Sequence, residues 1–213
     1  MEFLSKLIFL LKRPNLVIVA GDDREGIVET IFKVLKPYFK TKKVQKFSFQ
    51  NILRNKVLIL ETELGKVDKL KFFIRKSKLP ILAIAQTKES FLDNIARFQN
   101  LAKKLPSCTY LILNFDNKIN KNLENEAQLR YLSFGIQDGA DLKATDIHIN
   151  DKGINFKICY KGSIVPIWVP YSKFEKQESE LDNKKQIYNA LIAVSAGIIL
   201  GLNLVEISQA LKN

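Results

Sequence analysis

The sequence has few of the residues that build metal or redox sites. Its 213 residues include one histidine and two cysteines. His148 alternates with Ile147 and Ile149 and has no second His or Cys nearby, which argues against a metal role and predicts a solvent-facing side chain. Cys108 and Cys159 stand in apolar, strand-like runs without CxxC spacing, so we expect buried free thiols in a reducing cytoplasm rather than a disulfide.

Long apolar runs are also missing. Residues 1–13 place Phe3, Leu7 and Leu11 on one helical stripe, but this run is too short to span a bilayer and no small-residue cleavage site follows it. We therefore predict an amphipathic N-terminal helix over residues 1–14 and a cytoplasmic protein. The basic residues that flank the run leave peripheral membrane contact through residues 1–13 open as an alternative.

Acidic residues do not balance the basic ones, and the formal net charge is +12. Such an excess attracts nucleic acid, anionic lipid or an acidic partner. Most of it is lysine, scattered through the first two thirds of the chain instead of forming one run interleaved with aromatic residues. The pattern favours a solvated lysine-rich surface over a dedicated nucleic-acid site.

Residues 15–35 give the clearest structural pattern of the sequence, a buried strand followed by a turn and a helix. Leu16 to Ala20 form a continuous apolar run typical of a strand buried on both faces, Gly21 marks a turn, and apolar residues then recur with helical period. Further strands and helices alternate with it, which predicts an α/β fold with a doubly wound, mostly parallel sheet. The other strands of this sheet are expected at 57–61, 80–85 and 110–113, with helices at 66–78 and 90–105.

The pattern changes after the fourth strand. We expect a small antiparallel β subdomain within residues 131–170, then a charged loop over 171–185, a strongly apolar helix over 186–200 and a short helix over 204–212. The expected short strands are 131–135, 146–149, 155–160 and 164–169.

The turn after the first strand stands where a phosphate-binding loop would, but its residues differ. Such a loop needs glycines, a lysine for the terminal phosphates and a Ser or Thr for magnesium. Here residues 21–27 read GDDREGI. Carboxylates of Asp22, Asp23 and Glu25 would lie at a helix N-terminus, where they accept bonds from free N–H groups and occupy the place of a phosphate.

Five segments carry a family resemblance: residues 58–61 (LILE), 111–114 (LILN), 131–135 (YLSFG), 139–147 (GADLKATDI) and 187–202 (IYNALIAVSAGIILGL). In that order they look like a strand ending in a magnesium-binding glutamate, a strand ending in Asn, a Phe-Gly strand, the opening of a small sheet, and an Asn-Ala helix leading into Gly-Leu. These are features of the central, ATP-binding domain of the Mur ligases. The chain resembles that P-loop-like domain, and most of all that of the D-alanyl-D-alanine-adding ligase of peptidoglycan synthesis.

The resemblance implies a central-domain fold over residues 15–213, without the family's amino-terminal sugar-nucleotide domain or its carboxy-terminal amino-acid-binding domain. The family activates a carboxylate as an acyl phosphate with ATP, and an amine then attacks to form an amide. By resemblance, the candidate cofactor-binding residues are Gly21, Gly26, Glu61 and Asn189, with Glu61 as the magnesium ligand. Solvation is the plainer explanation for a glutamate at a strand end, and no catalytic residue is assigned.

The sequence departs from the family pattern at the residues that would bind phosphate and magnesium. The family has a glycine, a lysine and two hydroxyl residues at positions 24–27, which here read Arg-Glu-Gly-Ile. Glu25 in place of the lysine removes an attraction and adds a repulsion, each about 4 kcal/mol for charges about 4 Å apart at an effective dielectric near 20. The family's magnesium-binding histidine falls on Phe91, and its His-Asn pair falls on Lys185 and Gln186.

These departures predict a catalytically degenerate domain that acts as a binding or scaffold protein without a cofactor. Its expected partner is another protein, a second copy of the chain or a cell-wall precursor. One alternative is an ATP- and Mg²⁺-dependent carboxylate-amine ligase subunit that works with separate chains. A second alternative is a basic module that binds nucleic acid or anionic membrane, of which nucleic acid is disfavoured by the scattered lysines.

Overall fold

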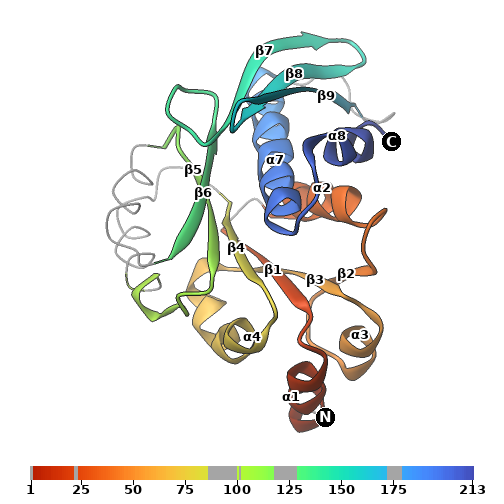
Figure 1. Cartoon of the computed structure of the whole chain (residues 1–213), viewed down its shortest axis with the longest axis vertical. Helices are drawn as coiled ribbons and strands as arrows, with labels where there is room; N and C mark the ends of the chain where they lie inside the picture. The colour runs from red at the N-terminus through yellow and green to blue at the C-terminus, as the bar shows by residue number, and fades with distance from the viewer. Residues whose placement is uncertain (1, 22–23, 86–99, 101, 118–128, 172–178) are drawn as a thin grey trace.

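The computed structural model describes residues 2–21, 24–85, 100, 102–117, 129–171 and 179–213. Helices and strands within these residues alternate along most of the chain (Figure 1). The strands are β1 Asn15–Ala20, β2 Thr41–Val44, β3 Val57–Thr62, β4 Pro80–Ile84, β5 Tyr110–Asn114, β6 Arg130–Gly135, β7 Leu142–Asn150, β8 Gly153–Tyr160 and β9 Ser163–Pro170. The helices are α1 Glu2–Lys12, α2 Glu25–Leu35, α3 Phe49–Arg54, a 3₁₀ helix Leu64–Leu70, α4 Lys71–Lys76, α7 Glu180–Ile199 and α8 Leu204–Lys212.

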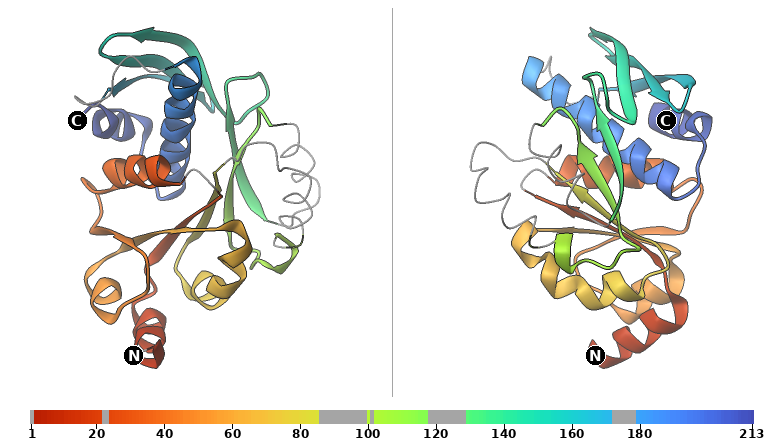
Figure 2. Two further views of the ribbon diagram at one scale, coloured as in Figure 1. Left: turned by 180° about the vertical axis from the view of Figure 1, so that it is seen from behind. Right: turned by 60° about the vertical axis from the view of Figure 1, so that its left-hand side comes forward.

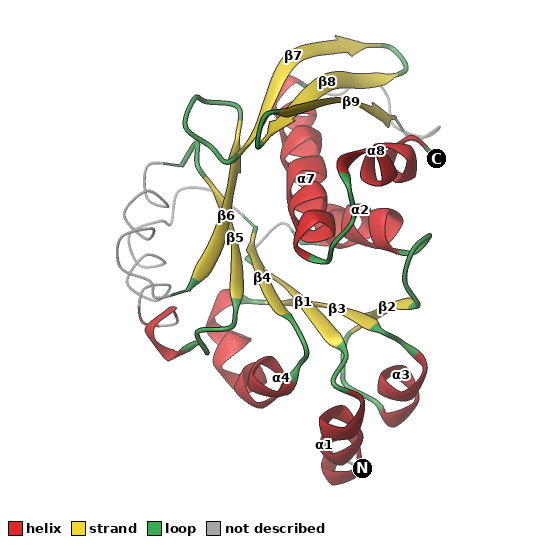
Figure 3. Cartoon of the chain, in the orientation of Figure 1, coloured by secondary structure: helices red, strands yellow, loops and turns green. Residues whose placement is uncertain are grey.

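The described strands form one sheet in the order β2-β3-β1-β4-β5-β6-β7-β8-β9. Pairing is parallel from β2 to β7 and antiparallel from β7 to β9. The α/β class and the mostly parallel sheet are therefore confirmed. The three antiparallel strands continue the same sheet at the end that carries β6 (Figure 3).

Strand β1 lies between β3 and β4 in the sheet and is buried on both faces. Alternate side chains of a strand point to opposite faces, and Val17 and Val19 accordingly join one hydrophobic cluster while Leu16, Ile18 and Ala20 join the other. This explains why the sequence of β1 is apolar throughout instead of alternating.

Helices cover the two faces of the sheet in separate groups. The cluster that contains Val17 also contains buried side chains of α2, α7 and α8. The other contains Phe9 of α1, Ile52 of α3, Val67 of the 3₁₀ helix and Ile74 of α4. Figure 2 shows the same division, with the red, orange and yellow α1, α3 and α4 on one side and the blue α7 and α8 on the other. No helix of the described residues is long and apolar enough to cross a membrane.

Helix α7 begins earlier than the apolar pattern predicted. We expected a charged loop up to residue 185, but the helix starts at Glu180 because Ser179 and Asp182 form a capping box: each side chain accepts a hydrogen bond from the other's backbone N–H. Residues 172–178 of the expected loop lie outside the described residues. The helix ends before Gly201, whose φ of +96° suits the left-handed C-terminal position.

Other expectations need correction. The helix expected at 66–78 is a 3₁₀ helix followed by α4, and β2 and α3 were not predicted at all. Cys108 is exposed and Cys159 half-buried, so the expected burial of both thiols is wrong; both are free. Most of the helix expected at 90–105 lies outside the described residues.

The antiparallel strands β7 to β9 are longer than expected. β7 starts at Leu142 instead of residue 146 and contains an irregularity between Thr145 and His148. Asp146, within that irregularity, has φ +49°. Such a bulge lets the strand bend while pairing continues on either side of it. His148 is exposed, as expected.

Helix α1 is held to the domain by an aromatic cluster. Phe9 is fully buried, with its ring centroid 5.6 Å from that of Phe47 and 4.9 Å from that of Phe73, in edge-to-face geometry. Phe47 and Phe73 stack on each other. On the same helix, Phe3 is 81% exposed.

We predict that Phe9→Ala lowers the free energy of unfolding by about 3–5 kcal/mol, because it leaves a cavity inside the aromatic cluster. The matched variant Phe3→Ala, on the exposed side of α1, should change it by less than about 0.5 kcal/mol. Urea denaturation followed by circular dichroism measures both. Equal effects of the two substitutions would contradict this account of how α1 is attached.

Candidate functional site

The candidate site lies at the carboxyl ends of β1, β3 and β4, where open parallel sheets bind ligands. Gly21 follows β1 and is held between the two neighbouring strand ends. Its N–H donates to the Thr62 carbonyl at 3.3 Å, and the Ala85 N–H donates to the Ala20 carbonyl at 2.7 Å. A Cβ on Gly21 would lie 2.1 Å from the Ala85 carbonyl oxygen, and its φ is +135°. Only glycine fits this turn without a backbone shift.

Arg24 is the N-terminal flanking residue of α2, and its side chain turns back onto the loop. The guanidinium donates from Nη1 to the Gly21 carbonyl, and the Arg24 side chain makes no cap hydrogen bond to the helix. Glu25 lies in the first turn of α2, as expected. Asp22 and Asp23 lie outside the described residues. The one described cation of the loop is therefore engaged with the loop's own backbone.

A cavity of about 640 Å³ opens beside this turn, between α2 and the ends of β2 and β3. Its lining is largely charged: Arg24, Glu25, Val28, Glu29, Lys43, Val44, Gln45, Ile59 and Glu61. Lys43 forms an ion pair with Glu29 on the far wall. Glu61, exposed at the end of β3, therefore shares a solvent-open, polar cavity with Arg24 and Glu25.

Asn189 reaches the site from α7. A Cβ added to Gly26 would lie 2.8 Å from the Asn189 Nδ2 atom, so the side-chain amide lies directly against the first turn of α2. Glycine at position 26 is what permits this approach. Of the four residues predicted from the sequence, the structure thus brings Gly26 and Asn189 into contact, places Gly21 in the turn and places Glu61 in the cavity wall.

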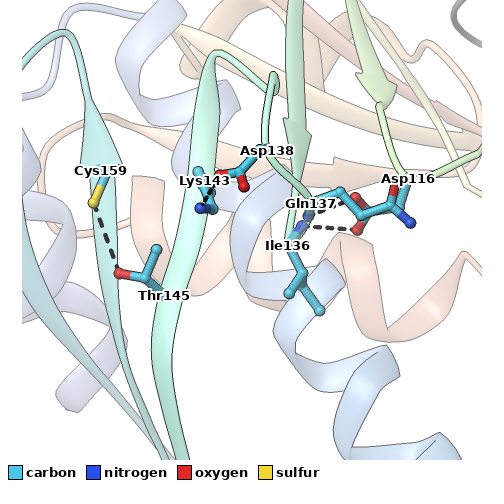
Figure 4. A network of polar contacts seen from close by, with 7 residues as sticks. All are labelled: Asp116, Ile136, Gln137, Asp138, Lys143, Thr145 and Cys159. Carbon is cyan, nitrogen blue, oxygen red and sulfur yellow. Dashed lines mark hydrogen bonds and ion pairs between the residues drawn. The ribbon is translucent and has the colours of Figure 1, made fainter.

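A second polar cluster lies at the end of β5 and involves Asp116, which the sequence analysis did not single out. Its carboxylate accepts hydrogen bonds from the backbone N–H groups of Ile136 at 2.7 Å and Gln137 at 2.9 Å (Figure 4). The phenol of Tyr188, on α7, donates to the same carboxylate at 2.8 Å. Asp116 thereby joins β5, the connection after β6 and α7.

Two adjacent residues of α7 therefore serve the two clusters: Tyr188 contacts Asp116, and Asn189 contacts the start of α2. The signal that could have identified Asp116 is its position two residues after the buried Asn114, whose side-chain oxygen accepts the Asp116 N–H at 2.9 Å. Burial, and then the hydrogen bond to Asp116, raise the pKa of the Tyr188 phenol far above its ordinary value.

The connection between β6 and β7 carries a further contact. Lys143 pairs with Asp138, and this hydrogen bond and charge hold the pKa of the Asp138 carboxyl below its usual range (Figure 4). Nearby, Thr145 Oγ1 and Cys159 Sγ lie 3.7 Å apart. Within the described residues no three His, Cys, Asp or Glu side chains are grouped so as to hold a metal ion.

Comparison with known proteins identifies the class. The model of the Mur ligase middle domain matches residues 88–197 of the 213. The chain belongs to the Mur ligase family.

Individual relatives are similar to this chain over parts of their length. The UDP-N-acetylmuramoyl-L-alanyl-D-glutamate--2,6-diaminopimelate ligase of Alkaliphilus oremlandii is 30% identical over 155 residues, which are 70% of this chain and 29% of that protein. The UDP-N-acetylmuramate--L-alanine ligase of Persephonella marina is 27% identical over 123 residues, 57% of this chain and 24% of that protein. The chain thus spans less than a third of either relative.

Solved structures share the fold. MurF from Acinetobacter baumannii superposes with a TM-score of 0.73 at 14% identity, over 99% of this chain and 48% of that one. The MurF ligase of Thermotoga maritima, solved in complex with ADP, gives a TM-score of 0.69 at 13% identity, over 97% of this chain and 51% of that one. The chain therefore has the fold expected from the resemblance and spans about half the length of these structures.

We predict that Tyr188→Phe lowers the free energy of unfolding by about 1 kcal/mol at neutral pH, because Asp116 loses one of its donors. Since the phenol's pKa is higher in the folded chain than the ordinary 10.0, its stabilising effect is complete below pH 10.0 and is lost as the pH rises further. Wild type should therefore lose stability more steeply than Tyr188→Phe above that pH. Urea midpoints measured across this range test the prediction, and parallel profiles would contradict it.

Proposed function

We propose that this chain is a Mur ligase central domain that does not turn over ATP and acts as a binding or scaffold protein, with a peptidoglycan precursor or a partner protein as its ligand. The observation that carries the proposal is the loop after β1. Its described cation, Arg24, donates to the Gly21 carbonyl, and Glu25, at the position of the family's lysine, lines the cavity instead.

The charge of the cavity supports this proposal. Glu25, Glu29 and Glu61 line it against Arg24 and Lys43, and Lys43 is already paired with Glu29. A triphosphate brought to this wall would meet carboxylates at close range with little compensating positive charge, which is unfavourable at any effective dielectric of a protein surface. The groups present do not fit a bound nucleotide triphosphate.

The contact between Gly26 and Asn189 points the same way. The family has a hydroxyl residue at position 26, whose side chain would coordinate magnesium. Here that space is taken by the Asn189 amide, because a Cβ at position 26 would lie 2.8 Å from its Nδ2 atom. Gly26 therefore offers Mg²⁺ no hydroxyl ligand at this position.

The ligand class is proposed from the relatives. The two curated relatives compared above are named as ligases of UDP-N-acetylmuramate and of its peptide derivative. A chain that keeps their central fold but has an altered loop is suited to bind such a precursor, or the enzymes that handle it, without activating it.

One observation favours the alternative of an ATP-dependent carboxylate-amine ligase subunit. The glycine turn after β1 keeps its close approach to Ala85, and Glu61 keeps its place in an open cavity. Such a subunit would need another source for the cation that the family's lysine supplies.

We predict that wild type shows no saturable heat when titrated with millimolar ATP and Mg²⁺ in a calorimeter, because a carboxylate, Glu25, stands at the position of the family's phosphate-binding lysine. Glu61→Ala should behave identically. In the same instrument, UDP-N-acetylmuramoyl-peptide without nucleotide tests the proposed ligand class.

The outcome that contradicts the proposal is micromolar binding of ATP by wild type that Glu61→Ala abolishes. That result would assign Glu61 to a working nucleotide site and favour the ligase subunit. Glu25→Lys is the matched gain-of-charge variant: if the carboxylate at position 25 is what excludes the phosphates, this change should increase ATP affinity over wild type.

A further inference from the structure

Helix α1 presents an apolar face that nothing in the described residues covers. Five large apolar side chains of this one helix are at least 39% exposed: Phe3, Leu4, Leu7, Leu10 and Leu11. Their spacing of three, four, seven and eight residues places them on one side of the helix. Phe49 and Leu53 of α3, on which α1 packs, are exposed as well. Together α1 and α3 supply seven of the 13 exposed large apolar side chains of the described residues.

This exposure is not the fraying of a loose terminus. The opposite side of α1 is fixed by the fully buried Phe9, whose ring packs on Phe47 and Phe73, and by the buried Ser5. The helix is therefore docked by one face, while its second, apolar face is exposed and is not covered by any described residue.

Basic side chains surround this face. Residues 2–14, 49–56 and 71–80, which contain α1, α3, α4 and the turns after them, hold nine Lys and Arg and a single acidic residue, Glu2. Backbone contacts bring two of these turns together: the Lys78 N–H donates to the Pro14 carbonyl at 3.1 Å, and the Asn15 N–H donates to the Lys56 carbonyl at 2.9 Å. Exposed Lys12, Lys56 and Lys78 thus lie around the C-terminal end of α1.

We propose that α1 docks the domain on an anionic membrane surface, with its apolar face in the headgroup region and the basic residues around it against the lipid phosphates. An apolar stripe flanked by Lys and Arg is the pattern of a helix that lies in the membrane interface. A basic side chain is favourable at the C-terminus of a helix because of the helix dipole, and this accounts for Lys12 in α1 and Arg54 in α3. It does not account for Lys56 and Lys78, which lie outside these helices, or for the exposed Phe and Leu side chains.

Two other occupants fit less well. A second copy would bring the same basic residues of both chains together, which is repulsive. Nucleic acid would engage the basic residues but gain nothing from the five apolar side chains.

Binding to a membrane through α1 also leaves the candidate site accessible, because α1 precedes the amino end of β1 whereas the cavity lies at the carboxyl ends of β2 and β3 (Figure 1). The inference is independent of whether the chain binds ATP.

Sedimentation of the full chain with lipid vesicles tests the proposal. Wild type should bind vesicles of phosphatidylcholine mixed with phosphatidylglycerol and bind at least about tenfold more weakly to phosphatidylcholine alone or at high salt. The double variant Phe3→Ser and Leu11→Ser should lower partitioning into the mixed vesicles at least about tenfold. The matched control, Leu181→Ser and Val205→Ser, alters comparably exposed side chains of α7 and α8 and should leave it unchanged.

A charge test uses equal changes in net charge. Lys12→Glu with Lys78→Glu should weaken binding to the mixed vesicles more than Lys152→Glu with Lys212→Glu, which are exposed elsewhere. The proposal is overturned if wild type does not bind the mixed vesicles or if Phe3→Ser with Leu11→Ser binds as wild type does. It is also overturned if wild type is a dimer in sedimentation velocity and does not bind vesicles, and the Phe3→Ser and Leu11→Ser variant is a monomer. In that case the apolar face of α1 would bind a second copy of the chain.

Discussion

The burial of β1 between two hydrophobic clusters is the constraint on which the rest of the structure depends. Each cluster receives alternate side chains of this strand, so the helices on both faces of the sheet pack against the same five residues, 16–20. The strand end is consequently fixed from both sides, and the turn at Gly21 lies too close to the Ala85 carbonyl to accommodate a side chain. The candidate site owes its geometry to the core below it.

Much of the fold could be predicted from the sequence because the central strands are apolar runs separated by helical patterns. β2 was missed because Thr41 to Val44 carries two lysines and only one buried side chain, as edge strands often do. The start of α7 was missed because its first turns are charged, and the capping box, not the apolar period, sets where it begins. Cys108 was misplaced because it lies before β5 rather than within it.

The candidate site was predicted in part. The loop after the first strand located Gly21 and Gly26, and matched family segments located Glu61 and Asn189. Residue identity alone could not show that Asn189 lies against Gly26, or that Glu61 lines a cavity together with Arg24 and Glu25. Those relations depend on how α7 docks, which is a tertiary property. Asp116 was missed for a similar reason, since its three donors come from Ile136, Gln137 and Tyr188 and none of them is near it in sequence.

The docking of α7 and α8 against α2 has a consequence for how the chain folds. The buried face of α2 is covered by helices formed from the last 34 residues, and Lys33 donates to the Leu211 carbonyl across 178 residues of sequence. Contacts of such long range slow folding, because the intervening chain must be ordered before they form. During synthesis, the face of the sheet that carries α2 therefore stays only partly covered until the C-terminal helices have left the ribosome, and it needs protection from aggregation in the interval.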